Sequence, residues 1–209
     1  MPGSITFHQE RSTAAKRSAK YPGVRMAVDG SEAVVWVEGQ LSQAAFVHAM
    51  PPANRMAQRF ERLAAKGTPN LWNEKVLYAR AESALGAASM CVGFALSVGR
   101  ATTFTGGQGL VQMIEVLHTA AGKRLPLVFH AASISLASQA LTMQAGHDDI
   151  NAIRDCGWGI LCARNPQEAA DLAVIARRAA ELAETPFLNV QDGFITSHGL
   201  ATARLPEPE

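Results

Sequence analysis

The stretch that most constrains the fold of this chain is residues 82–110, ESALGAASMCVGFALSVGRATTFTGGQGL. Its first part is apolar and rich in small residues, which predicts a buried helix whose smooth surface another chain is expected to cover. Residues 101–105 are mostly β-branched or aromatic and predict a strand. A glycine-rich turn then opens the next predicted helix, residues 109–122. Strands joined by tight turns to helices are typical of α/β proteins.

The glycine-rich turn contains Gly106, Gly107 and Gln108. Unpaired backbone N–H groups at a helix start can receive a polar or anionic group, so we predict that these residues bind a cofactor. The alternative is steric, because tight turns between a strand and a helix need glycine whether or not a ligand binds. The side chain of Gln108 could donate to a ligand or cap its own helix. The sequence leaves these alternatives open.

The composition excludes several classes of protein. The chain has 209 residues, a formal net charge of +1 and 48% apolar residues, which suits one globular domain and argues against nucleic acid as the main partner. No apolar run is long enough to span a membrane, and the N-terminus lacks the apolar region of a secretory signal. The three cysteines have no CxxC spacing and cannot hold a four-cysteine iron–sulfur cluster. They are expected to be buried small residues in a reducing cytoplasm.

Predicted strands and helices alternate along the rest of the chain. This alternation predicts a single-domain, doubly wound parallel sheet over residues 25–200, with a flexible arm at 1–24 and a polar tail at 201–209. The other predicted strands are 45–50, 72–79, 125–132, 158–164 and 186–194, and the other predicted helices are 31–44, 53–67, 135–143 and 165–183.

Two groups of charged residues receive ordinary explanations. His147, Asp148 and Asp149 have a metal-like composition, but acids at a helix start are favoured by the helix dipole, so no metal site is predicted there. Arg177 and Arg178 are expected to lie on the solvated face of the long helix.

Several segments together resemble one family. ATTFTGGQGLVQMIEVLHTAAGKRLPLVFHAA, NPQEAADLAVIARRAA, PFLNVQDGFITSH and DGSEAVVWVEGQLSQAAFVHAMPPANRMA resemble domain I of pyruvate:ferredoxin oxidoreductase and its 2-oxoacid relatives, over roughly residues 28–198. The resemblance implies a thiamine diphosphate-binding-like fold that supplies the pyrimidine side of the cofactor site. It also implies oxidative decarboxylation of a 2-oxoacid to an acyl-coenzyme A, with electrons passed to ferredoxin.

The resemblance further implies partner subunits. The family's diphosphate side holds Mg²⁺ through a GDG motif, which is absent here, so this chain offers at most half of the cofactor site. The diphosphate-side domain, the Mg²⁺, the iron–sulfur clusters and the coenzyme A site are then expected on partner chains or in a longer polypeptide. We expect a homo- or hetero-oligomer.

The chain departs from the family pattern at substrate and catalytic positions. His48 stands in the segment where the family has a substrate-contacting threonine, and Ile134 stands where it has an arginine for the substrate carboxylate. The glutamate that activates the pyrimidine ring falls on Ala84 in an ungapped alignment; with an insertion in the helix, Glu82 is the activator. His130, at the end of a predicted strand, could face the substrate or be a satisfied buried histidine. We retain Glu82, His48, His130 and Ile134 as candidate site residues.

Three functions remain open. The first is a catalytic subunit of a 2-oxoacid:ferredoxin oxidoreductase with Glu82 as activator. The second is a structural subunit of such a complex that has lost its catalytic groups. The third is a free-standing nucleotide-binding domain, for which the glycine turn is the only support.

Overall fold

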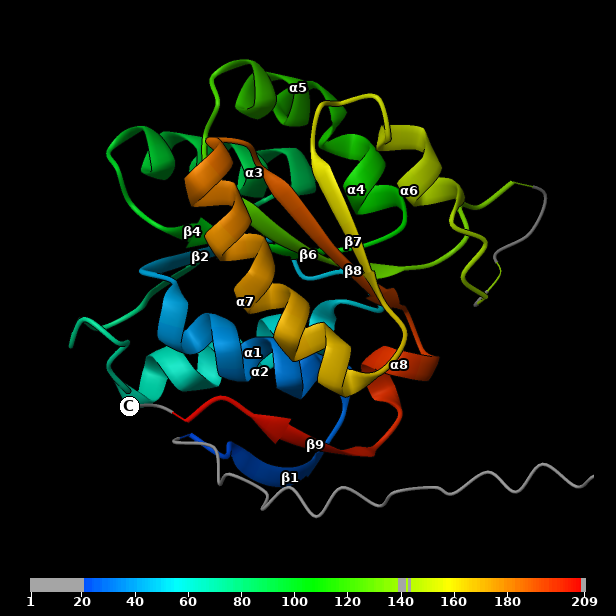
Figure 1. Ribbon diagram of the computed structural model, residues 1–209. Coiled ribbons are helices and arrows are strands. Elements are labelled where there is room, and N and C mark those ends of the chain that lie inside the picture. The colour runs from blue at the N-terminus through cyan, green and yellow to red at the C-terminus, as the bar shows by residue number, and fades with distance from the viewer. Residues whose placement is uncertain (1–20, 139–141, 143, 208–209) are drawn as a thin grey trace, which may run out of the picture.

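The computed structural model describes residues 21–138, 142 and 144–207, and its centre is a parallel sheet (Figure 1). Hydrogen-bonded neighbours follow the orders β3-β2-β4 and β5-β6-β8-β7. Only Thr103 separates β4 from β5, and its carbonyl accepts a hydrogen bond from the N–H of His130 on β6, so the two parts form one sheet. The strands are β1 (Val24–Val28), β2 (Ala44–Val47), β3 (Leu77–Arg80), β4 (Ala101–Thr102), β5 (Phe104–Thr105), β6 (Val128–Ser133), β7 (Gly159–Ala163), β8 (Phe187–Asp192) and β9 (Ala201–Leu205).

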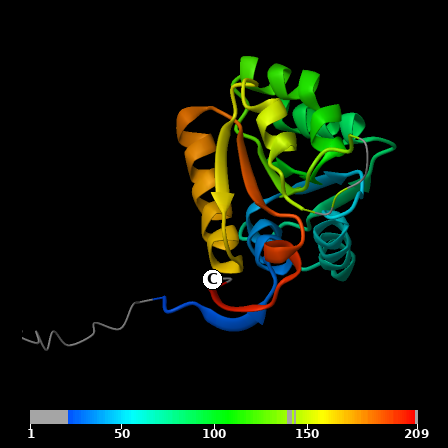
Figure 2. The same cartoon turned by 90° about the vertical axis from the view of Figure 1, so that its right-hand side faces the viewer.

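Helices cover both faces of the sheet, as a doubly wound fold requires. Side chains from α1, α2 and α7 pack in one apolar cluster, and side chains from α3, α4, α5 and α6 pack in another on the opposite face. Figure 2 shows α7 (orange) separated from the green helices by strands of the sheet. The helices are α1 (Gly30–Leu41), α2 (Asn54–Lys66), α3 (Ala84–Leu96), α4 (Gln108–Gln112), α5 (Ile114–Gly122), α6 (Asp148–Ile153), α7 (Pro166–Ala183) and α8 (Ile195–His198).

The predicted α/β architecture is therefore confirmed, and its central strands lie where the sequence placed them. Strand β6 is fully buried and pairs in parallel with β5 and β8, as its uninterrupted apolar composition predicted. The clearest predicted helix is also confirmed: α7 begins with Pro166 after Asn165, whose side chain accepts from the N–H of Glu168.

Some element boundaries differ from the prediction. The strand expected at 101–105 is interrupted at Thr103, and the helix expected at 109–122 is divided at Met113 into α4 and α5. The helix expected at 135–143 is absent from residues 135–138, while most of 139–143 lies outside the described residues. The helix propensity of these residues predicted a helix. In the structure the N–H of Leu136 donates instead to the carboxylate of Asp148, a contact outside any helix of this segment.

A small antiparallel pair, β1 with β9, lies against α1 and α7 and joins the two ends of the described chain. Val24 pairs with Leu205, and the inward side chains Val28, Ala203 and Leu205 are buried. Residues 201–205, which we expected in a polar tail, thus form a strand of the domain. Alternation of exposed and buried residues along β9 is the physical reason that it can pack on the helices.

Candidate functional site

The candidate site lies at the carboxyl edge of the sheet, where the turns after β2, β5, β6 and β8 meet. The side chain of Ile134, after β6, packs against glycines of two of these turns: a methyl group placed on Gly107 would lie 2.8 Å from its Cγ1, and one on Gly193 would lie 2.5 Å from its Cγ2. Ligands of open α/β sheets bind at this edge, outside the carboxyl ends of the strands.

The glycine turn is held from within the chain. The N–H of Gly107 donates to Oδ2 of Asp149 at 3.0 Å, and the N–H of Ile134 donates to the same oxygen at 3.2 Å. The hydroxyl of Ser133 donates to Oδ1 of Asp149 at 2.8 Å, so the buried carboxylate joins the turn after β5 to the end of β6. Asp149 therefore does more than favour a helix start: it occupies the N–H group of Gly107 that we predicted for a cofactor.

The other two residues of the turn remain at the edge. Gly106 is buried against the carbonyl of Ala132 on β6, and a methyl group in its place would lie 2.1 Å from that oxygen. Gln108 is half-buried and begins α4. The start of α4 has no side-chain cap, so Gln108 does not cap its own helix.

The start of α3 decides where the two candidate activators lie. Ser83 is the N-cap, its hydroxyl accepting from the N–H of Gly86 at 3.0 Å, so the helix begins at Ala84. Ala84 is buried and faces the glycine turn, since a methyl group on Gly109 would lie 3.6 Å from its Cβ and 3.3 Å from the sulfur of Met50. The position that the ungapped alignment assigns to the activator therefore holds a methyl group.

Glu82 precedes this cap and its side chain is exposed. His48, after β2, lies next to it: the Nδ1 of His48 is 3.1 Å from the carbonyl oxygen of Ala81. The structure thus places His48 against Ala81, the residue before Glu82, and it brings Gly106 and Gly107 against Ala132 and Ile134 at the end of β6.

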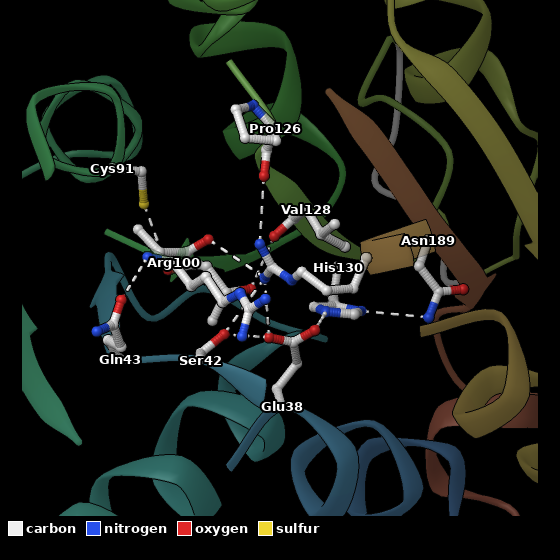
Figure 3. Close-up of polar contacts among 12 residues, drawn as sticks. Glu38, Ser42, Gln43, Cys91, Arg100, Pro126, Val128, His130 and Asn189 are labelled. Atoms are coloured by element: carbon white, nitrogen blue, oxygen red, sulfur yellow. Dashed lines mark hydrogen bonds and ion pairs between the residues drawn. The ribbon is translucent and has the colours of Figure 1, made fainter. Parts of the chain in front are cut away.

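His130 does not join these residues, because it lies within β6 rather than at its end and is buried. Its ring belongs to a polar cluster beneath the sheet (Figure 3). Nδ1 is 3.2 Å from Nδ2 of Asn189, and Nε2 is 3.0 Å from Oε1 of Glu38. The second contact has the distance of a close pair, although neither atom makes a hydrogen bond of good geometry. His130 is thus a buried histidine of this polar cluster and lies apart from the glycine turn.

Arg177 completes this cluster, which corrects our expectation that it lies on a solvated helix face. It is 3% exposed, and its Nη2 lies 3.2 Å from Oε2 of Glu38 and 3.3 Å from the hydroxyl of Ser42. Ser42 itself donates to Glu38. Arg178, by contrast, is exposed as expected.

The cluster holds Glu38 in its charged form. Burial alone would raise the pKa of the Glu38 carboxyl, but the charge of Arg177 and the contacts with His130 and Ser42 outweigh it and lower the pKa to about 2. This ionised, buried group links α1 to Arg177 of α7 and approaches His130 of β6.

Sequence reasoning missed Glu38, Arg177 and Asp149 as buried polar residues. The sequence did contain a sign that Glu38 and Arg177 are buried, because each lies on an apolar helix face. Glu38 lies among Val34 and Val37 of α1, and Arg177 lies among the buried alanines of α7. Asp149 gave no such signal, since acids at helix starts are common.

No group of His, Cys, Asp and Glu side chains in the described part of the chain could hold a metal ion. No described helix is long and apolar enough to cross a membrane.

Comparison with known proteins identifies the class of this domain. Residues 40–209 match the family described as "Pyruvate flavodoxin/ferredoxin oxidoreductase, thiamine diP-bdg". The chain belongs to this family of thiamine diphosphate-binding domains, as the resemblance of its motifs predicted.

Individual relatives agree with the family. The chain is 38% identical over 171 residues to a pyruvate-flavodoxin oxidoreductase of Nostoc sp., covering 82% of this chain and 42% of that one. It is 35% identical over 174 residues to the pyruvate:ferredoxin oxidoreductase of Moorella thermoacetica, covering 83% of this chain and 15% of that one. The chain thus spans less than half the length of these relatives.

A solved structure shows the same fold. The 2-oxoglutarate:ferredoxin oxidoreductase of Magnetococcus marinus superposes with a TM-score of 0.71 at 19% identity, covering 90% of this chain and 32% of that chain. The parallel α/β domain therefore has a thiamine diphosphate-binding-like fold.

Proposed function

We propose that this chain supplies the pyrimidine-side half of a thiamine diphosphate site in a 2-oxoacid:ferredoxin or flavodoxin oxidoreductase. The reaction would be the oxidative decarboxylation of a 2-oxoacid to an acyl-coenzyme A. The observation that carries the proposal is the family match over residues 40–209, which includes every turn at the carboxyl edge. The proposed setting is the cytoplasm, where the three free cysteines would stay reduced.

The residues at the edge fit the ring half of the cofactor. Met50, Ala84 and Ile134 place apolar side chains around the glycine turn, and the side chain of Ala84 is only a buried methyl group, too short to hold a flat ring away. Thiamine diphosphate, when bound, supplies the carbon centre and electron sink on which a 2-oxoacid can be decarboxylated. Glu82 would accept a hydrogen bond from the aminopyrimidine ring, which requires its exposed side chain to turn toward the edge over Ser83.

The remaining parts of the reaction are assigned to partners. We place Mg²⁺ and the diphosphate on another chain or another part of a longer polypeptide, because the sequence lacks the GDG motif of the family's diphosphate side. The iron–sulfur clusters and the coenzyme A site would lie there as well. Ile134 cannot pair with a carboxylate, so the substrate carboxylate would also be held by a partner residue or by His48.

A second candidate function is a structural subunit of the same complex. It is favoured by the buried methyl group of Ala84 at the activating position and by Asp149, which occupies the N–H group of Gly107. Under this proposal Glu82 is a surface acid before a helix cap, and the catalytic thiamine site lies elsewhere in the complex.

The substitution Glu82→Gln separates the two candidates. In the assembled complex it should reduce 2-oxoacid turnover by about 10²–10⁴ if Glu82 transfers or holds a proton at the ring. Glu115→Gln, which also removes an exposed acid close to a helix start, should leave turnover unchanged. Sedimentation and iron content would verify that each complex is intact. Unchanged turnover of an intact Glu82→Gln complex would favour the structural subunit.

A further inference from the structure

Helix α2 carries a row of cations along one face. Arg55, Arg59, Arg62 and Lys66 are spaced by four, three and four residues, which places them on one side of a helix over three turns. The opposite side of α2 is buried in the core through Met56, Ala57 and Phe60.

The two ends of this row differ in their partners. Arg55 and Arg59 both pair with the buried carboxylate of Asp29, Arg55 at 3.4 Å, and Arg59 also approaches Glu32 at 3.5 Å. Arg62 and Lys66 are exposed, and no carboxylate of the described residues pairs with either of them. The last two turns of α2 therefore present unneutralised positive charge.

A hollow with an apolar floor lies beside these cations, between α1 and α2. Its volume is about 500 Å³, and Val35, Trp36 and Leu63 form the apolar part of its lining. Glu32 also lines it, and Arg59 approaches this carboxylate. The helices approach closely here because α1 has Gly39, where a methyl group would lie 2.5 Å from Cδ1 of Leu63. The indole N–H of Trp36 donates to the carbonyl of Pro206 at 2.8 Å, so Trp36 contributes apolar ring atoms rather than a free donor to the hollow.

We propose that this basic groove, formed by Val35, Trp36, Arg62, Leu63 and Lys66, docks an acidic segment of a partner polypeptide. The charge is complementary, because Arg62 and Lys66 lack acids of their own while the floor suits one aliphatic side chain. Arg62 and Lys66 are four residues apart, about 6 Å along the helix axis, which matches the spacing of alternate side chains in an extended peptide. The proposal is independent of the thiamine site. Arg62 and Lys66 lie on the last two turns of α2, whereas the start of α2 is the end near the carboxyl edge of the sheet, because it follows β2.

The full chain can be tested with a fluorescein-labelled peptide of eight residues in which a leucine is flanked by glutamates. We expect saturable binding by fluorescence anisotropy that weakens as salt is raised. The same peptide with glutamines in place of the glutamates should not bind. Failure of the acidic peptide to bind better than the glutamine peptide would overturn the proposal.

Matched variants locate the site. Arg62→Glu and Lys66→Glu should each weaken binding about tenfold, whereas Arg178→Glu, which makes the same charge change at an exposed position of α7, should leave it unchanged. Thermal unfolding of each variant would verify the fold. An equal loss in Arg178→Glu would show attraction to the whole molecule rather than to this groove, and would also overturn the proposal.

Discussion

Arg177 of α7 pairs with Glu38 of α1 in a place almost closed to water: the side chains alone are 4% and 0% exposed, and Nη2 of Arg177 lies 3.2 Å from Oε2 of Glu38. The residues are 139 positions apart in the sequence. Their pairing joins two of the helices that cover one face of the sheet, and it neutralises two charges that burial would otherwise penalise.

Breaking this pair should destabilise the domain strongly. Glu38→Gln keeps the size of the side chain but leaves the Arg177 charge without compensation, which typically costs about 3–5 kcal/mol of unfolding free energy. Urea unfolding measures the change. The control is Glu184→Gln, which removes the exposed partner of Arg124 at 3.3 Å and should cost about 0–1 kcal/mol. Equal, small losses in both variants would contradict the structural role of Glu38.

The same carboxylate should make stability depend on pH. The pKa of Glu38 is lowered from 4.5 to about 2 in the folded protein, so the unfolded chain takes up a proton first as the pH falls. The stabilisation is complete above the unfolded pKa and is lost as the pH falls through the folded pKa. Urea midpoints measured from about pH 6 to about pH 2.5 should decline, and Glu38→Gln should flatten the decline. A decline of the same steepness in Glu38→Gln would assign the acid sensitivity to other groups.

Alanine substitutions at Gly107 and Gly122 should change the free energy of unfolding in opposite directions. Gly107 has φ +52°, and a methyl group there would lie 2.8 Å from Ile134, so Gly107→Ala should cost about 1–3 kcal/mol. Gly122 ends α5 and nothing lies within 4 Å of an added methyl group, so Gly122→Ala should stabilise by up to about 1 kcal/mol. Thermal unfolding of both variants provides the measurement. A neutral Gly107→Ala would mean that the turn can relax away from Ile134.

The exposed side of α3 should be a contact surface. The helix contains no charged residue, and Leu85, Met90 and Leu96 are 41%, 39% and 56% exposed. Gly93→Arg places a charge where an added carbon meets nothing within 4 Å, so it should preserve the melting temperature while reducing self-association or assembly with partners.

Sedimentation of the chain alone and with its partners would detect the loss. Gly122→Arg, which has equally open surroundings on α5, serves as the control and should assemble normally. A wild-type chain that stays monomeric and binds no partner would contradict this prediction.

The sequence predicted those parts of the fold that depend on local pattern. The buried composition of β6 and the cap and proline of α7 were sufficient to place both elements, because neighbouring residues determine them. The pairing of β1 with β9 was not predicted, since it depends on contacts between residues about 180 positions apart.

The sequence likewise predicted only those parts of the candidate site that local motifs determine. Motif resemblance located the glycine turn, Ile134 and the start of α3, and the structure brings these together. The motifs could not show that Asp149 accepts from the N–H of Gly107, or that His130 lies beside Glu38 and Asn189. Contacts between side chains that are distant in sequence leave no periodic pattern in it. Whether Glu82 activates a cofactor stays a prediction.

The pairing of Val24 with Leu205 has a consequence for how this domain can be connected to others. The polypeptide enters and leaves the sheet-and-helix body at neighbouring points, so flanking sequences of any length can be attached at both ends without moving the carboxyl edge. Such geometry makes a domain portable: it can be spliced into a longer chain, or its ends can be linked and new ends opened in a surface loop, with the packed interior unchanged. In the relatives, the region that matches this chain is a minor fraction of a longer polypeptide.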